Sequence, residues 1–174
     1  LILGSTPPFW FGLILVLFFS LNWRLFPATG MVSMRGDGGL IDILHHLVLP
    51  TIATAVAPAA IITRMVRTSM LEILSQEYIK VARAKGFSQR VILWKHALRN
   101  AIPPISTITG LQLGYLLGGA LFTEVVFAWP GLGNQLYYAI VARDLPVIQA
   151  AVLVIALSFV LVNLFTDFLN AYFE

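Results

Sequence analysis

Residues 69–100 read SMLEILSQEYIKVARAKGFSQRVILWKHALRN, and this stretch decides the fold. Together with Arg64 and Arg67 it holds eight of the chain's 11 Lys and Arg residues, but only two of its eight Asp and Glu residues. A long apolar segment lies on each side of it. One Lys or Arg at the centre of a spanning helix costs about 2.5–3.5 kcal/mol. We therefore predict that residues 68–101 form a loop outside the bilayer, between two membrane spans.

The composition is typical of a membrane protein. Hydrophobic residues make up 59% of the 174 residues and charged residues only 11%, against about a quarter charged in soluble domains. A helix needs about 20 apolar residues to cross the hydrocarbon core. Four windows reach or approach that length, and the apolar runs are continuous rather than alternating. We predict an all-α polytopic membrane protein, one domain over residues 1–174, with spans at residues 9–26, 47–66, 102–122 and 147–172.

The basic loop also predicts the orientation, because cytoplasmic loops carry an excess of Lys and Arg. The N-terminus, the 68–101 loop and the C-terminus of this chain are expected on the cytoplasmic side, and residues 27–46 and 123–146 outside. The net charge is only +3 and the basic residues lie beside spans, so nucleic acid is not an expected partner. The absence of Cys excludes disulfides, Cys-ligated zinc and thiol chemistry.

Within the loop, the pattern predicts two helices joined at a glycine. Ser69 and Glu72 have the spacing of a capping box at the start of the first helix. Gly86 fits the left-handed position after a helix end, and Ser88 can cap the second helix. The bend carries small residues, which favour close contact with another protein. A basic helix lying on anionic lipid, or a calmodulin-type target, is the alternative.

The spans contain two features that affect packing. Pro58 removes a backbone hydrogen bond and is expected to kink the second span, which membrane bundles tolerate. Gly110, Gly114 and Gly118 repeat at four-residue spacing in the third span, a pattern that lets helix backbones approach closely. This stripe is interpreted either as packing within the chain, or as a contact face to a second membrane subunit or a seam that slides during a conformational cycle.

Few residues are candidates for chemistry. Glu124 and Asp144 are expected to be solvated carboxylates, with contact to substrate as the alternative, and Asp167 is expected to reach the membrane interface. The Pro130–Gly131 pair predicts a type II turn. His45 and the adjacent His46 have no third ligand nearby, so no metal site is expected. No lysine follows a glycine, so no P-loop is present, and no cofactor is expected.

The loop resembles the cytoplasmic EAA loop of binding-protein-dependent ABC importer permeases, in the dipeptide, oligopeptide and nickel branch. The resemblance rests on the blocks EYIKVARAKG (77–86) and HALRNA (96–101). It continues through GGALF (118–122), FAWPGLG (127–133), ARD (142–144) and FVLVNL (159–164), so it covers nearly the whole chain. Lys80 and Val81 replace two residues of the name-giving triplet, and His96, Leu98 and Arg99 replace an Ile-x-Leu-Pro ending. Both departures favour the peptide branch.

The resemblance implies an inner-membrane permease subunit without enzymatic activity, in a bacterial or archaeal plasma membrane. Its implied partners are a homologous second permease, two cytoplasmic ATP-binding subunits, an external substrate-binding protein and the lipid bilayer. It implies import of peptides or related solutes such as nickel chelates or glutathione. The implied ATPase-coupling residues are Glu77, Tyr78, Ala82, Arg83, Ala84, Lys85, Gly86 and Ser88.

The family pattern further implies that this chain is the C-terminal part of a six-span permease, because members carry two more spans and an external domain before the equivalent of Leu1. Three rival functions remain open from the sequence. A passive channel would conduct without ATP, an intramembrane enzyme would need catalytic groups within the spans, and an anchoring subunit would leave uptake unchanged when span interfaces are altered.

Overall fold

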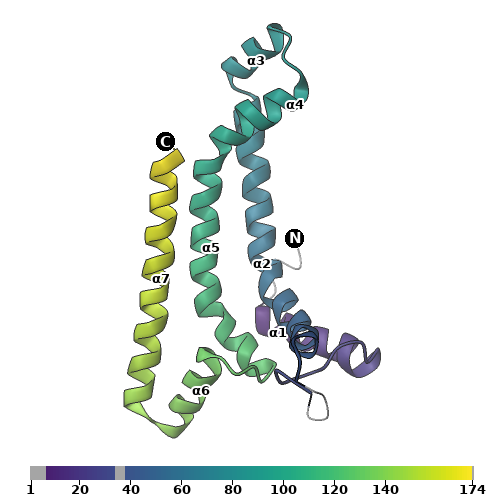
Figure 1. Ribbon diagram of the computed structural model, residues 1–174, viewed down its shortest axis with the longest axis vertical. Coiled ribbons are helices and arrows are strands. Elements are labelled where there is room, and N and C mark those ends of the chain that lie inside the picture. Colours follow the sequence, from purple (N-terminus) through teal and green to yellow (C-terminus); the bar gives the residue numbers. More distant parts are fainter. Residues whose placement is uncertain (1–6, 34–37, 174) are drawn as a thin grey trace. The chain divides into compact units, whose positions relative to one another are not determined.

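The computed structural model describes residues 7–33 and 38–173, and within them every regular element is helical. The prediction of an all-α chain is therefore confirmed over these residues. Figure 1 labels the elements. They are α1 (Pro8–Leu15), the π-helical η2 (Val16–Asn22), α2 (Leu40–Leu74), α3 (Glu77–Ala84), α4 (Gln89–Val91), the π-helical η3 (Ile92–Ala97), α5 (Leu98–Val126), α6 (Leu132–Ala142) and α7 (Leu145–Phe173).

Three helical stretches are long and apolar enough to cross a membrane: Leu40–Leu74, Gln89–Val126 and Leu145–Ala171. They contain or closely match three of the predicted spans, at residues 47–66, 102–122 and 147–172. The fourth predicted span, residues 9–26, corresponds to α1 with 8 residues and η2 with 7. This pair is shorter than the about 20 residues that a crossing helix needs, so a span there remains a prediction.

The chain divides into two compact units, and each long helix contributes to both. The first unit comprises Leu1–Pro58 and Tyr115–Phe159, and its core is a cluster of Leu15, Leu49, Ala53 and Phe127. Gly12 brings α1 close to this cluster, since a Cβ there would lie 3.1 Å from the Phe127 ring. The Gly30 amide also donates to the Phe127 carbonyl at 2.8 Å. Phe127 thus joins α1, α2 and the end of α5.

The second unit comprises Ala59–Gly114 and Val160–Glu174. Its small core consists of Ile79, Ala82 and Ile92, with Leu74 packed against them. Figure 1 shows α3 and α4 together at one end of this unit. We refer to residues 77–97, from α3 through η3, as the hairpin.

Two local predictions about the basic loop had different outcomes. Gly86 has φ +77°, and its amide donates to the Arg83 carbonyl at 2.9 Å, so the left-handed helix end is confirmed. The capping box at Ser69 is wrong, because α2 continues to Leu74 and Ser69 is buried within it. Residues 59–74 contain no glycine or proline that would end the helix at this position. The 68–101 loop therefore begins inside α2 and ends inside α5.

Candidate functional sites

Most of the predicted coupling residues lie on the surface of the hairpin. Glu77, Arg83, Ala84, Lys85, Gly86 and Ser88 are exposed, and Tyr78 is 43% exposed. Ala82 differs, because it is only 7% exposed and packs against Ile79 and Ile92. Its small side chain therefore allows α3 to approach η3. Of the small residues at the bend, Ala84 and Gly86 are the ones left at the surface.

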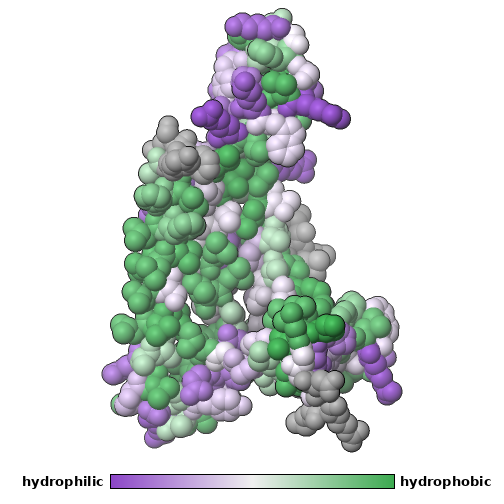
Figure 2. All heavy atoms as spheres, in the orientation of Figure 1, coloured by the Kyte–Doolittle hydropathy of each residue, from purple (hydrophilic) through white to green (hydrophobic). Residues whose placement is uncertain are grey.

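The exposed side of the hairpin combines charged and large apolar side chains. Figure 2 shows hydrophilic side chains gathered over α3 and α4, with hydrophobic ones among them. The large apolar side chains exposed there include Val81, Phe87 and Trp94, the last at 72%. Exposed apolar groups rimmed by polar residues are typical of protein interaction surfaces. The exposed side of the hairpin is therefore a mixed surface of charged and large apolar side chains.

Polar contacts also hold the hairpin to the start of α5. The Asn100 side-chain amide donates to the Tyr78 hydroxyl at 2.8 Å and to the His96 carbonyl at 3.0 Å. The Phe87 ring lies 5.7 Å from the His96 ring, centroid to centroid.

Lys80 pairs with Glu77 at 2.6 Å, but both side chains are exposed, and such pairs contribute little to stability. Ser88 occupies the N-cap position of α4 without a side-chain capping bond.

The glycine stripe of α5 contains two different environments. A Cβ at Gly110 would overlap the Thr166 side chain of α7, so Gly110 is needed for packing within the second unit. At Gly118, by contrast, no described atom lies within 4 Å of such a Cβ, apart from the chain neighbours and the nearby backbone of its own helix. Gly114 is buried. Packing within the chain therefore accounts for Gly110, while Gly118 lies at an open position, and a contact with a second membrane subunit or a sliding seam stays a prediction.

Asn170 joins α5 and α7, a contact that the sequence pattern did not predict. Its amide nitrogen donates to the Thr107 hydroxyl at 2.8 Å, and its amide oxygen accepts from the Ser106 hydroxyl. An asparagine within an apolar span was the available signal, because such residues commonly hydrogen-bond across helices. The nearby Asp167 is exposed.

Glu124 is the main correction among the predicted external residues. Its Oε2 accepts hydrogen bonds from the Gly133 amide at 2.7 Å and the Asn134 amide at 3.1 Å. These amides lie in the first turn of α6, where a negative charge is stabilised by the helix dipole and by unpaired N–H groups. Glu124 is therefore a partly buried capping residue supplied by another helix, and not a freely solvated carboxylate. We call Glu124 with Gly131, Gly133 and Asn134 the Glu124 cap.

The Glu124 cap explains why the predicted type II turn is wrong. Gly131 has φ −134° and ψ 178°, an extended conformation at the N-cap of α6, whereas a type II turn needs positive φ there. A Cβ on Gly131 would overlap the Glu124 carboxylate, and a Cβ on Gly133 would lie 2.5 Å from the Leu121 Cα. The chain instead reverses at Ala128, with φ +48°. The two glycines are required for space and not for their backbone freedom.

The other predicted residues of this unit have local roles. The exposed Asp144 accepts from the Val147 amide at 3.3 Å, at the start of α7. His46 is buried, with Nδ1 2.9 Å from the Asp42 carbonyl oxygen, and His45 Nε2 lies 2.9 Å from the Leu25 carbonyl oxygen. The two imidazoles thus bind backbone carbonyls. Over residues 7–33 and 38–173, no group of three or more His, Asp or Glu side chains is arranged to hold a metal.

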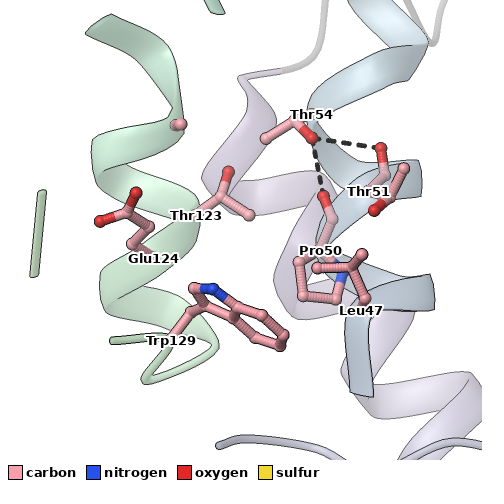
Figure 3. Close-up of a pocket in the computed structure, with 8 residues that line it drawn as sticks. Leu47, Pro50, Thr51, Thr54, Thr123, Glu124 and Trp129 are labelled. Atoms are coloured by element: carbon pink, nitrogen blue, oxygen red, sulfur yellow. Dashed lines mark hydrogen bonds between the residues drawn. The ribbon is translucent and has the colours of Figure 1, made fainter. Parts of the chain in front are cut away.

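A hollow of about 140 Å³ lies between α2 and α5 in the first unit, and we call it the α2–α5 hollow (Figure 3). The Thr54 hydroxyl at its edge donates to the Pro50 carbonyl at 2.8 Å. The Thr123 hydroxyl is buried and has no hydrogen-bond partner among the described residues. The hollow is lined by Leu47, Pro50, Thr51, Thr54, Ala120, Thr123, Glu124 and Trp129.

Comparison with known proteins agrees with these features. The family model described as "Binding-protein-dependent transport system inner membrane component" matches residues 1–174. The dipeptide transport system permease protein DppB of Escherichia coli K12 is 43% identical over 95% of this chain and 55% of its own length. The di/tripeptide transport system permease protein DppB of Pseudomonas aeruginosa is 41% identical over 95% of this chain and 54% of its own length. The oligopeptide transport system permease protein AppB of Bacillus subtilis is 43% identical over 96% of this chain and 53% of its own length.

The chain thus spans about half the length of the curated relatives that it matches. The family is a transport component and not a catalytic subunit, and the long apolar helices agree with a multi-pass membrane protein. The family model matches all 174 residues, and each of the three relatives is more than 40% identical to this chain over the matched part. The chain belongs to the family of binding-protein-dependent transport system inner membrane components.

Proposed function

We propose that this chain forms the translocation path of an ATP-driven peptide importer, together with a homologous second permease. The observation that carries the proposal is the similarity to permeases of dipeptide, di/tripeptide and oligopeptide transport systems over at least 95% of the chain. Peptides are favoured over nickel chelates and glutathione because each of these relatives is named for peptide transport. An external binding protein would deliver the peptide.

The hairpin is the proposed contact with the partner ATPases. It is the most strongly charged surface of the second unit, and it joins two helices that are long enough to span the membrane. The proposed coupling residues are those exposed on it, from Glu77 to Ser88, with Ala82 supporting the fold from inside. A movement of the ATPases would then be transmitted to α2 and α5, because the hairpin core includes Leu74 at the end of α2 and Ile92 just before α5.

The proposed topology follows the positive-inside bias. The hairpin and both chain ends face the cytoplasm, and the Glu124 cap faces outward. The segment at residues 9–26 is proposed to complete a fourth crossing, beside the three long helices. Labelling of single cysteines introduced at exposed positions tests this arrangement, since the native chain contains no cysteine. Labelling of Arg90→Cys from the external side, in intact cells, would contradict it.

The function is tested by purifying the transporter that contains this chain and reconstituting it with its binding protein in liposomes. Uptake of a labelled dipeptide is expected to require ATP, and the second permease and two ATPases are expected to co-purify with the chain. Conductance without ATP would favour a channel. Uptake that survives disruption of the span interfaces would favour an anchoring subunit.

A further inference from the structure

The α2–α5 hollow contains an unsatisfied polar group. Thr123 is only 3% exposed, and its hydroxyl has no hydrogen-bond partner in the described part of the chain. Helical threonines usually bond the carbonyl one turn earlier. Thr54, Thr109 and Thr166 do so in this protein, at 2.8–2.9 Å. Because a buried hydroxyl without a partner is unfavourable, Thr123 is a group that a ligand would satisfy.

The remaining lining indicates what kind of ligand fits. Leu47, Pro50, Ala120 and the Trp129 ring make the hollow mainly apolar. Figure 3 shows Thr123 projecting from α5 toward α2, while Glu124 projects in a different direction from the same helix. The Glu124 carboxylate is held by the first turn of α6. The hollow therefore favours a neutral, apolar group beside a hydrogen-bonding one, and not a cation.

The size of the hollow limits how much of a ligand it can hold. Sites that enclose a whole small molecule have volumes of about 300–1,000 Å³, whereas this hollow has about 140 Å³. It can accept one side chain of a larger ligand. A peptide group next to that side chain offers both a donor and an acceptor, and a threonine hydroxyl pairs with either.

We propose that the α2–α5 hollow holds one apolar residue of the transported peptide, whose backbone forms a hydrogen bond with the Thr123 hydroxyl. This inference rests on the proposed function. It makes the permease itself selective, since a residue without a side chain would leave the hollow empty. Thr123 is then a specificity-determining residue.

Two variants test the proposal in the reconstituted transporter, at saturating concentrations of peptide-loaded binding protein. Ala120→Leu fills the hollow. It is expected to lower uptake of a Leu-Leu dipeptide about tenfold relative to a Gly-Gly dipeptide, within the range for crowding in an apolar pocket. Thr123→Val keeps the side-chain shape but removes the hydroxyl, and is expected to lower Leu-Leu uptake about two- to tenfold, as for one hydrogen bond. Thr109→Val is the matched control, because the Thr109 hydroxyl already bonds the Ile105 carbonyl.

Equal effects of Ala120→Leu on both dipeptides would overturn the proposal, as would a Thr123→Val transporter that behaves like Thr109→Val. Should Ala120→Leu fail to assemble, Thr123→Val, which is closer in shape to the native residue, still decides the outcome. A native transporter that takes up neither dipeptide with ATP would overturn the proposed function itself. If only the subsite proposal fails, the native transporter takes up both dipeptides with ATP, but Ala120→Leu affects both dipeptides equally or Thr123→Val behaves like Thr109→Val.

Discussion

At the hairpin, Gly86 lies in the turn that follows α3, where a Cβ would meet no described atom within 4 Å other than its chain neighbours, whereas in the Glu124 cap a Cβ on Gly131 or Gly133 would overlap its neighbours. The hairpin has a core of three buried residues and exposes Tyr78, Val81, Phe87 and Trp94. The cap pairs its partly buried polar groups with one another. Glycine therefore serves opposite purposes in the two regions. In the cap it allows two segments of the chain to pack closely, and in the hairpin it adopts a left-handed conformation at an open surface.

The largest effect on stability is expected from Gly133→Ala. The added Cβ would meet the Leu121 backbone at 2.5 Å, and backbone cannot move aside as a flexible side chain can. Overpacking of this kind costs about 1–3 kcal/mol. Thermal unfolding of the detergent-solubilised transporter should show a lowered Tm. Gly118→Ala is the control, because its Cβ has open space. Equal Tm values for the two variants would contradict the claim that Gly133 is required for close packing.

Unlike Gly133→Ala, Gly86→Asn is expected to lower transport without lowering the stability of the protein. Asparagine tolerates the left-handed conformation that Gly86 adopts, and the described chain leaves room for its side chain. A loss of about tenfold in ATP-driven uptake, corresponding to about 1.4 kcal/mol of lost coupling, is expected with an unchanged Tm.

The matched control for Gly86 is Gly38→Asn. Gly38 has φ +61° and open surroundings, but lies outside the hairpin. Normal uptake in Gly86→Asn, or an equal loss in Gly38→Asn, would show that the hairpin corner is not a close docking surface. Gly86→Asp extends the test, because it adds a negative charge at the same place.

Glu124→Ala is expected to destabilise the cap by about 1 kcal/mol, the typical effect of removing an N-cap side chain. Glu124→Gln keeps an acceptor for the Gly133 and Asn134 amides and should retain part of that stability. Asp144→Ala provides the comparison, because Asp144 accepts from α7 at the longer distance of 3.3 Å while exposed to solvent. A smaller drop in Tm for Glu124→Ala than for Asp144→Ala would contradict the assigned capping role.

Asn170→Ala is expected to have an effect of similar size to Glu124→Ala. Interhelical hydrogen bonds in membrane proteins contribute on average about 0.6 kcal/mol each, and this variant removes the contacts to Ser106 and Thr107. A modest decrease in Tm is expected, with Asn163→Ala in the same helix as the control. A loss of uptake without any change in Tm would instead assign Asn170 to the translocation path.

The sequence predicted the features that depend on local pattern. The apolar windows identified α2, α5 and α7, because span length and composition are properties of a single segment. The Gly86 helix end followed from the glycine after Lys85. The capping box at Ser69 was predicted wrongly for the same reason: the local pattern does not show that the preceding helix continues through Ser69.

The features that depend on contacts distant in sequence could not be read in this way. Glu124 precedes the amides that it binds by 9 and 10 residues, a spacing that matches no helical or turn motif. The Pro130–Gly131 pair satisfied the rule for a type II turn, but the carboxylate beside Gly131 and the packing against Leu121 determine the conformation instead. The unsatisfied Thr123 hydroxyl likewise becomes visible only when the surrounding atoms are known.

The Glu124 cap has a consequence for how deeply its segment can lie in the membrane. A free glutamate must stay hydrated, which keeps it in contact with water at the surface. Here the N-terminus of α6 offers partial positive charge and two amide donors to the carboxylate. The carboxylate and the helix end neutralise part of each other's charge and satisfy each other's hydrogen bonds. The start of α6 can therefore lie at the membrane interface, beside Trp129, with the carboxylate and the two amides already hydrogen-bonded within the chain.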